Sequence, residues 1–408
     1  MANVSSSNGL EKRPKLRFPG FDEPWKAALL SDYFVKNIKK NADGAITNVI
    51  CNSAKQGLIP QRNYFDKDIA NSDNTDGYYI IETNDFVYNP RKSTDAPYGP
   101  ISCYKYPEAG IVSPLYLCFR AKQEINPLYF EWCFRSSVWH RYIYMSGDSG
   151  ARHDRVSIKD DTFFAMPINI PSAKEQDRIA LFLNAIEQRI DKQRSLVEAL
   201  KKYKRGLVFT AFSPCNPYGI TVEPTPLTHL LQEYRKRETT NLRVCSVAVA
   251  KGVVDQLEHL GRSFAASDTS HYGRVKPGDV VYTKSPTGDF PYGIVKQNWL
   301  QEDVAVSPLY GVYTPLTYEV GYLIHTYFEQ SSNANNHLRT LAQKGAKNTI
   351  NITTAHFLDK DIPFPNREDE VSMLVGLFSR INKRIESEES KLNKIVTQRK
   401  TLMQQLFI

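Results

Sequence analysis

The sequence predicts an α+β protein: two duplicated globular domains joined by two long helices, which form an antiparallel coiled coil with pseudo-two-fold symmetry. Three observations lead to this prediction. Short motifs recur at a constant offset, short strand-like runs lie between Gly and Pro turns, and each half closes on a long charged stretch with helical spacing. The length of 408 residues suits two or three domains.

The recurring motifs indicate a diverged tandem duplication. Pro97-Tyr98-Gly99 returns as Pro291-Tyr292-Gly293, an offset of 291 − 97 = 194 residues, and Ser113–Tyr116 returns as Ser307–Tyr310 at 307 − 113 = 194. The pair Asp85 and Tyr88 likewise returns as Asp279 and Tyr282. Many matches in one register are the signature of a repeat, here of about 195 residues.

The repeat and the helical stretches set the predicted boundaries. We expect an N-terminal tail at 1–20, a first globular domain at 21–171, a helical region at 172–213, a linker with a second globular domain at 214–365, and a second helical region at 366–408. Strand-like runs such as Tyr78–Tyr88 and Val275–Tyr282 end in turn or basic residues, which favours a substantial sheet in each half. The first helix should end at Ser213-Pro214.

Polar residues interrupt the apolar seam of each predicted helix. They are Gln193 and Lys204 in the first and Glu388 and Arg399 in the second, and 388 − 193 = 399 − 204 = 195. Polar seam residues fix register and orientation. Two-fold symmetry would set Lys204 opposite Glu388 and Gln193 opposite Arg399, whereas a parallel pair would bring two cations together. The alternative is that all four extend to solvent at the edge of the seam.

Composition excludes several classes of protein. No apolar run reaches the roughly 18 residues that a membrane span needs, and the Ser- and Asn-rich start is not a signal peptide. The six cysteines form no Cys-x-x-Cys pair, so we expect reduced thiols in a cytoplasmic protein, and the histidines show no metal-binding spacing. The net charge of +8 permits a nucleic-acid partner without requiring one.

The sequence contains fragments of three catalytic motifs, and each fragment lacks an essential residue. Gly288 to Gly293 has the glycine spacing of a phosphate loop, but Ile294 stands in the place of the lysine. Asn216-Pro217-Tyr218 lacks the second proline of an amino-methyltransferase motif, and Glu389-Ser390-Lys391 lacks the Pro-Asp partner of a nuclease triplet. The sequence therefore favours a chain without catalysis of its own, although a Ser/His/Asp arrangement assembled by the fold stays open.

Basic and polar residues cluster in loops that follow strand-like runs in both halves. Arginine reads guanine in the major groove, asparagine reads adenine, and lysine pairs mainly with phosphate, so we interpret these loops as DNA-binding. The alternative is ordinary solvated loop charge. The candidates are Arg91, Lys92, Arg152, His153 and Arg155 in the first half, and Lys284, Lys344, Lys347 and Asn348 in the second.

Several passages resemble the DNA-specificity (S) subunit of type I restriction-modification systems, and the resemblance covers nearly the whole chain. They are Lys15–Phe21 with Trp25, the passage from Pro171 through Glu175-Gln176 to Phe212, and Leu402–Phe407. The second half departs from the Glu-Gln motif, because Glu368-Asp369-Glu370 has no glutamine, which leaves the start of that helix open. The recognition domains of this family vary greatly, so no DNA-reading residue is carried over.

The resemblance implies a non-catalytic subunit that reads a split, asymmetric double-stranded DNA target, one half with each recognition domain. Two methyltransferase subunits would carry S-adenosylmethionine, and restriction subunits would use ATP and Mg²⁺, so no cofactor is expected in this chain. The helical pair would act as the ruler between the half-sites. Two alternatives stay open: a fused DNA methyltransferase or nuclease, and a structural coiled-coil adaptor without DNA contact.

Overall fold

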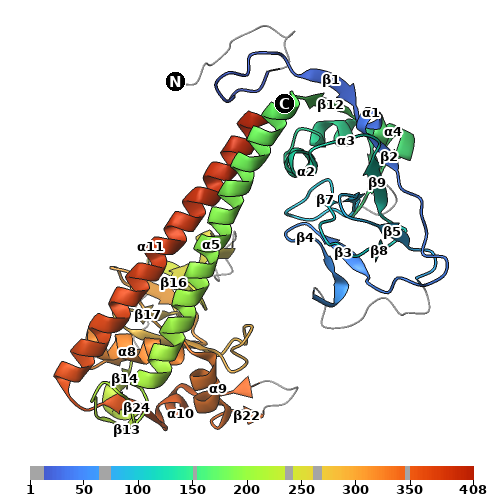
Figure 1. The fold of residues 1–408 in the computed structure, drawn as a ribbon. Helices are drawn as coiled ribbons and strands as arrows, with labels where there is room; N and C mark the ends of the chain where they lie inside the picture. The colour runs from blue at the N-terminus through green and yellow to red at the C-terminus, as the bar shows by residue number, and fades with distance from the viewer. Residues whose placement is uncertain (1–12, 64–74, 150–153, 235–241, 261–268, 345–349) are drawn as a thin grey trace. The chain divides into compact units, whose positions relative to one another are not determined.

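The chain folds into two compact units, each of which is described here by itself. The computed structural model describes residues 13–63, 75–149, 154–234, 242–260, 269–344 and 350–408. Unit 1 consists of residues Met1–Gln193 with Lys391–Ile408, and unit 2 consists of Arg194–Ser390. Each long helix therefore contributes one part to each unit (Figure 1).

Unit 1 contains a four-stranded antiparallel sheet in the order β2-β9-β6-β7, with the smaller pairs β5-β8, β3-β4, β10-β11 and β1-β12. Its elements, in chain order, are β1 (Lys26–Leu29), α1 (Leu30–Tyr33), β2 (Phe34–Lys36), β3 (Ile50–Ser53), β4 (Gly57–Pro60), the 3₁₀ turn η1 (Gln61–Asn63), β5 (Tyr79–Ile81), β6 (Phe86–Tyr88), β7 (Ile101–Cys103), β8 (Gly110–Val112), β9 (Leu117–Ala121), α2 (Pro127–Arg135), α3 (His140–Ser146), β10 (Asp148–Ser149), β11 (Val156–Ser157), α4 (Asp160–Phe164), β12 (Pro167–Ile170) and the first part of α5 (Ala173–Ala211).

Unit 2 contains the sheets β14-β21-β18-β19 and β16-β15-β20-β17, with the pairs β13-β24 and β22-β23. Its elements are β13 (Val222–Pro226), α6 (Leu227–Leu230), β14 (Leu231–Glu233), β15 (Arg243–Ala248), β16 (Gly252–Asp255), α7 (Gln256–Leu260), β17 (Gly273–Val275), β18 (Val280–Thr283), β19 (Ile294–Gln297), β20 (Val304–Val306), β21 (Gly311–Pro315), α8 (Tyr318–Phe328), α9 (Ser331–Arg339), β22 (Gln343–Lys344), β23 (Ile350–Asn351), α10 (Thr354–Leu358), β24 (Asp361–Pro365) and the first part of α11 (Glu368–Leu406).

The two units follow the same element order, with η1 of unit 1 in the place of α7 of unit 2. The main sheets match strand for strand, since β2-β9-β6-β7 corresponds to β14-β21-β18-β19. Even a parallel contact is repeated: β15 pairs with β20 in parallel, and in unit 1 a parallel bridge joins Val49 to Ile111. The mixed α and β content and the two long helices agree with the sequence prediction.

The repeated Pro-Tyr-Gly motif builds the same turn in both units. The hydroxyl of Tyr88 donates to the carbonyl of Tyr98, and the hydroxyl of Tyr282 donates to the carbonyl of Tyr292, both at 2.9 Å. Burial raises the pKa of both phenols, so each hydroxyl remains a donor. The motif thus anchors a buried strand tyrosine to the turn that follows it.

The start of α5 explains the Glu175-Gln176 motif. Arg17 reaches from the N-terminal segment and pairs with both carboxylate oxygens of the buried Glu175, at 2.7 and 2.8 Å. The side chain of Gln176 donates to the carbonyl of Pro171 at 3.1 Å. In unit 2, the buried Glu370 instead accepts from the backbone amide of Thr221 at 3.0 Å. The missing glutamine therefore does not prevent the second helix, which begins at Glu368 with an acidic turn that suits its dipole.

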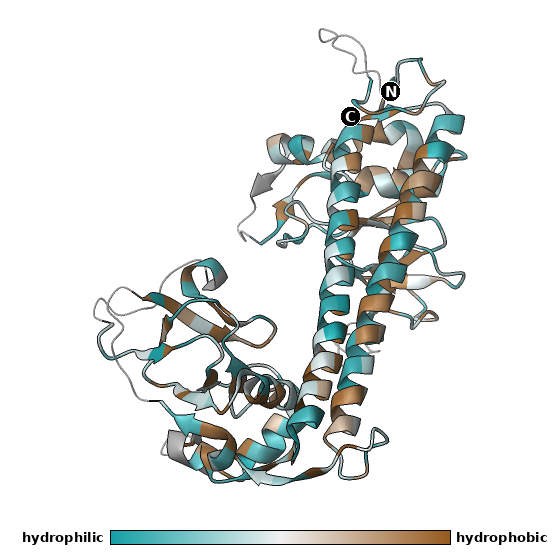
Figure 2. Ribbon diagram, turned by 90° about the vertical axis from the view of Figure 1, so that its left-hand side faces the viewer, coloured by the Kyte–Doolittle hydropathy of each residue, from teal (hydrophilic) through white to brown (hydrophobic). Residues whose placement is uncertain are grey.

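Segments of α5 and α11 run antiparallel within each unit. In unit 2, Lys201 of α5 pairs with Glu389 at 2.9 Å, and Phe212, directly after the end of α5, stacks on Phe378, which is earlier on α11. In unit 1, Arg399 forms an ion pair with Glu187. Figure 2 shows apolar and polar residues alternating along both helices, as expected for helices that bury one face.

The three charged seam residues, Lys204, Glu388 and Arg399, take part in ion pairs. Lys204 is largely buried and pairs with Glu329 of unit 2, just after α8, so it does not extend into solvent. Glu388 is buried and pairs with Arg384 one turn away at 2.9 Å. Contacts of Lys204 with Glu388 and of Gln193 with Arg399 stay predictions.

Candidate nucleic-acid interface

Two of the predicted basic groups of unit 1 are brought together by backbone pairing. Arg91 and Arg155 face each other across an antiparallel bridge. On either side, the amide of Lys92 donates to the carbonyl of Asp154 at 2.8 Å, and the amide of Val156 donates to the carbonyl of Pro90 at 2.9 Å. The loop after β6 and the segment before β11 therefore form one basic edge.

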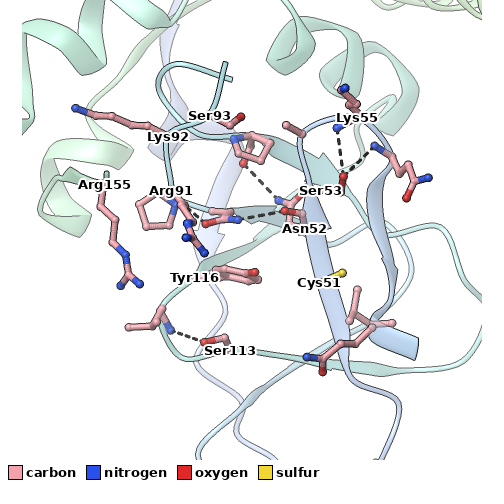
Figure 3. Close-up of a pocket in the computed structure, with 18 of the residues that line it drawn as sticks. Cys51, Asn52, Ser53, Lys55, Arg91, Lys92, Ser93, Ser113, Tyr116 and Arg155 are labelled. Carbon is pink, nitrogen blue, oxygen red and sulfur yellow. Dashed lines mark hydrogen bonds between the residues drawn. The ribbon is translucent and has the colours of Figure 1, made fainter. Parts of the chain in front are cut away.

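This basic edge borders a cleft of about 780 Å³ in unit 1. Arg91, Lys92 and Arg155 line it together with Lys55, Leu115 and Tyr116. In Figure 3, Arg91 lies beside the ring of Tyr116, Arg155 lies on the same side, and Lys55 stands on the opposite side near Ser53. Four cations around one cleft can attract a polyanion.

The floor of the cleft is a fixed hydrogen-bond network. The side-chain amide of buried Asn52 donates to the carbonyl of Val87 at 2.8 Å, and its oxygen accepts from the hydroxyl of Ser102 at 2.7 Å. Asn89 donates to the carbonyl of Asn52 at 3.1 Å and accepts from the amide of Arg91 at 3.0 Å. Both asparagine amides serve the fold, and they hold the basic loop in place for a ligand.

The cations around the cleft can change partners at little cost. The Arg91 side chain is 69% exposed and lies 3.9 Å from Asp154, and the Lys55 side chain is 76% exposed and lies 3.4 Å from Asp95. Such exposed pairs contribute at most about 1 kcal/mol, so phosphate groups can replace the carboxylates. Among the residues that the structure describes, Lys92 and Arg155 have no carboxylate within 4.0 Å.

Burial favours the neutral forms of the tyrosine and the cysteine that line the cleft. Burial raises the pKa of the Tyr116 phenol, so the phenol stays neutral, and its ring packs against the core beside the cleft. Burial also raises the pKa of the Cys51 thiol, whose sulfur donates to the carbonyl of Ile59 at 3.6 Å. A raised pKa disfavours the reactive thiolate form of Cys51.

The corresponding groups of unit 2 are only partly described. Lys284 directly follows β18 and is half-buried, and Lys344 ends β22, whose backbone pairs with β23. Lys347 and Asn348 lie outside the described residues, as do Arg152 and His153 of unit 1. A basic edge assembled from separate segments is therefore described in unit 1 only.

Sequence reasoning missed Lys55, Leu115 and the asparagine framework as parts of this site. Lys55 comes from the β3–β4 turn, and only the fold places that turn beside the loop after β6. Leu115 belongs to the repeated Ser-Pro-Leu-Tyr run, which was recognised as a repeat but not as part of a site. The recurrence of an apolar residue within a turn was the signal that could have identified it.

The incomplete catalytic motifs have structural explanations. Gly288 and Gly293 both have positive φ and lie between β18 and β19. Asn216 donates to the carbonyls of Ser213 and Ile220 and so closes a turn after α5. Glu389 is the ion-pair partner of Lys201 on the helix surface.

Neither a metal site nor a membrane span is found within the described residues. There, no group of three or more His, Cys, Asp and Glu side chains could hold a metal ion. None of the helices described is long and apolar enough to cross a membrane.

The fold is similar to known structures although the sequence has diverged. No protein-family model and no curated protein matches the chain. A chain in a structure of complex assembly and conformational transition of the type I R-M system is 14% identical, with a TM-score of 0.54 over 94% of this chain and 96% of that one. The S subunit of a type I restriction-modification system from M. genitalium is 10% identical, with a TM-score of 0.53 over 97% and 99%. The chain therefore has the fold of the S subunit of a type I restriction-modification system.

Proposed function

We propose that the chain is the DNA-specificity subunit of a type I restriction-modification complex. The observation that carries this proposal is the likeness of fold, which extends over 94% or more of the chain. The cleft of unit 1 supports it independently, because arginines and lysines beside a fixed polar floor suit a phosphate backbone and base edges.

Each unit would read one half of a split, asymmetric target. In unit 1, Arg91 and Arg155 are the candidate base readers, because a guanidinium can bond the O6 and N7 atoms of guanine together. Lys55 and Lys92 would pair with phosphates and fix the register on the duplex. In unit 2, Lys284 and Lys344 would play the phosphate role, and Lys347 and Asn348 would complete that loop.

The two long helices would form an antiparallel coiled coil that sets the distance between the half-sites. The antiparallel pairs within each unit support this, since Lys201 contacts Glu389 in unit 2 and Glu187 contacts Arg399 in unit 1. The duplicated element order supports a pseudo-two-fold arrangement as part of this proposal. Buried polar residues would keep the two helices in one register.

The chemistry would belong to partner subunits. We propose two methyltransferase subunits that bring S-adenosylmethionine, and restriction subunits that hydrolyse ATP with Mg²⁺ and cut DNA. Exposed apolar side chains on α5 support protein partners on the helices, since Leu181, Tyr203 and Phe209 are each more than half exposed. The chain itself would carry neither cofactor nor catalytic residue.

The test is DNA binding by the chain in complex with its methyltransferase partner. The target would first be identified as the sequence that carries methyladenine in a genome encoding the system. The complex should bind this duplex at least about 1,000-fold more tightly than a scrambled duplex, and its affinity should fall steeply with salt. Equal affinity for both duplexes would contradict the proposal, and methyl transfer by the isolated chain would assign it to the enzymes instead.

A further inference from the structure

The repeated Ser-Pro-Leu-Tyr run forms the same turn in both units. Ser113–Tyr116 connects β8 to β9, and Ser307–Tyr310 connects β20 to β21. In both turns the tyrosine amide donates to the serine carbonyl at 3.0 Å, and the leucine amide donates to the serine hydroxyl at 3.3 Å. The leucine therefore occupies the third position of a closed turn.

The fold explains three of the four residues but not the leucine. Serine accepts the hydrogen bond, proline suits the second position of a turn, and each tyrosine packs against its core. Leu115 is 59% exposed and Leu309 is 71% exposed. An apolar side chain in that position stabilises neither the turn nor the core.

The neighbouring core residues diverged while this leucine did not. Buried Cys118 and Phe119 of unit 1 correspond, at the same offset of 194, to Val312 and Tyr313 of unit 2. Core positions tolerate such apolar exchanges if volume is kept. An exposed leucine that persists beside altered core residues points to a contact outside the chain.

Both leucines lie beside the candidate basic loops. In unit 1, Tyr88 at the end of β6 pairs with Leu117 at the start of β9, so the loop containing Arg91 adjoins the turn containing Leu115. Arg91 and Leu115 line the same cleft, and Figure 3 shows Tyr116 of the turn beside Arg91. In unit 2, the register Tyr282 to Gly311 likewise places the loop of Lys284 next to the turn.

We propose that Leu115 and Leu309 each contact the 5-methyl group of a thymine in the major groove, one in each half-site. The inference rests on the proposed DNA-binding function. The thymine methyl is the apolar group that base edges offer in the major groove, and a leucine among cations reaches it while the cations pair with phosphates. A partner protein is a less suitable occupant, because an apolar patch that covered the leucine would also cover the neighbouring cations without compensating their charge.

The test combines protein and DNA variants that remove the same contact. The complex of the chain with its methyltransferase partner is titrated with target duplexes in which each thymine in turn is replaced by deoxyuridine, which lacks only the methyl group. We expect one position in each half-site at which the replacement weakens wild-type binding about 4- to 15-fold, as burial of one or two methyl groups predicts. Leu115→Ala should weaken binding similarly and remove the sensitivity in one half-site alone, and Leu309→Ala should do so in the other.

Leu316 provides a matched control. It is 71% exposed like Leu309, but it follows the other end of β21, and position 122 of unit 1 is a lysine at the equivalent place. Leu316→Ala should leave affinity and deoxyuridine sensitivity unchanged. Because all three leucines are exposed, the thermal unfolding midpoints of the three variants should stay near that of the wild type.

The outcomes separate this inference from the proposed function. If the wild-type complex binds its target specifically but no deoxyuridine sensitivity disappears in Leu115→Ala and Leu309→Ala, the thymine contact is wrong and the proposed function stands. If these variants weaken assembly with the methyltransferase in the absence of DNA, the leucines belong to a protein interface and the inference is likewise overturned. A wild-type complex without specific binding contradicts the proposed function itself.

Discussion

Single glycines show how a repeated motif can be a steric requirement. Gly99 and Gly293 have positive φ, and a Cβ at either position would overlap a backbone carbonyl oxygen, that of Asn89 or that of Thr283. Gly99→Ala and Gly293→Ala should each lower the free energy of unfolding by about 2–4 kcal/mol, because strain and overlap act together. Urea unfolding followed by circular dichroism measures this change.

Gly206 is the matched control for that prediction. It lies within α5, where a Cβ would have no atom within 4 Å. Gly206→Ala should therefore stabilise the protein by about 0.5–1 kcal/mol through helix propensity. Equal destabilisation by all three substitutions would contradict the steric explanation.

Two equivalent aspartates differ in the charge that they face. Asp85 accepts two hydrogen bonds from the guanidinium of Arg120, at 2.6 and 2.7 Å, and one from the amide of Glu82 at 2.8 Å. Asp279 instead accepts from the hydroxyl of Thr314 at 2.9 Å, and burial raises its pKa. The duplication kept the buried carboxyl group and replaced its partner.

This difference predicts unequal effects of removing the charge. In Asp85→Asn the new NH₂ group must face hydrogen-bond donors in either orientation of the amide. The free energy of unfolding should therefore fall by about 2–3 kcal/mol. In Asp279→Asn the threonine hydroxyl can turn to accept, so the loss should stay below about 1 kcal/mol. The midpoints of urea unfolding of the two variants measure this difference. A larger loss of stability for Asp279→Asn than for Asp85→Asn would contradict the prediction.

At the scale of elements, helices α8 and α9 carry buried histidines. Burial lowers the pKa of His337 to about 4 and lowers the pKa of His325 well below its ordinary value. His325 accepts a hydrogen bond from the amide of Gln297 at 3.0 Å, so the neutral ring is part of the packing. These helices are built around imidazole groups that must remain uncharged.

Unit 2 should consequently lose stability in mild acid. Between about pH 6.5 and 4 the unfolded chain binds a proton at position 337 that the folded chain does not, so the free energy of unfolding falls as pH falls through this window and is unaffected above it. For His337 the full loss is about 3 kcal/mol. Unfolding midpoints measured from pH 7.5 to 4.5 should fall less steeply in His337→Gln, whereas His229→Gln, at an exposed position, should follow the wild type.

The long helices could be located from sequence more accurately than their contacts. The apolar spacing and the Ser213-Pro214 break predicted a helical region at 172–213, and α5 runs from Ala173 to Ala211. The same spacing could not identify Glu329 as the ion-pair partner of Lys204, because Glu329 follows α8, an element outside the helix pair. Periodicity reports which face of a helix is buried, but it does not report which element covers that face.

At the scale of the whole molecule, DNA recognition should divide between the two units. Arg91→Ala with Arg155→Ala should weaken discrimination in one half-site by about 1–3 kcal/mol for each base that is no longer read, and should leave the other half-site intact. Lys284→Ala with Lys344→Ala should affect the other half-site. Binding to duplexes with single base changes in each half-site measures this division.

The control for charge removes two exposed lysines elsewhere in unit 1, Lys26 and Lys159. Their replacement by alanine should lower affinity slightly for all duplexes through the net charge alone. If the arginine and lysine pairs of the site also act equally on both half-sites, they serve general attraction to phosphate and do not read bases.

Sequence alone determined the repeat, the two helices and the list of candidate basic loops, because turns, periodicity and local charge are properties of short segments. Only the tertiary structure decided that Arg155 lies against Arg91, that Lys55 faces the same cleft and that the exposed Leu115 borders it. These neighbours are joined by backbone bridges and strand register between distant segments. Such pairing depends on how the whole unit packs, and no short stretch of sequence specifies it.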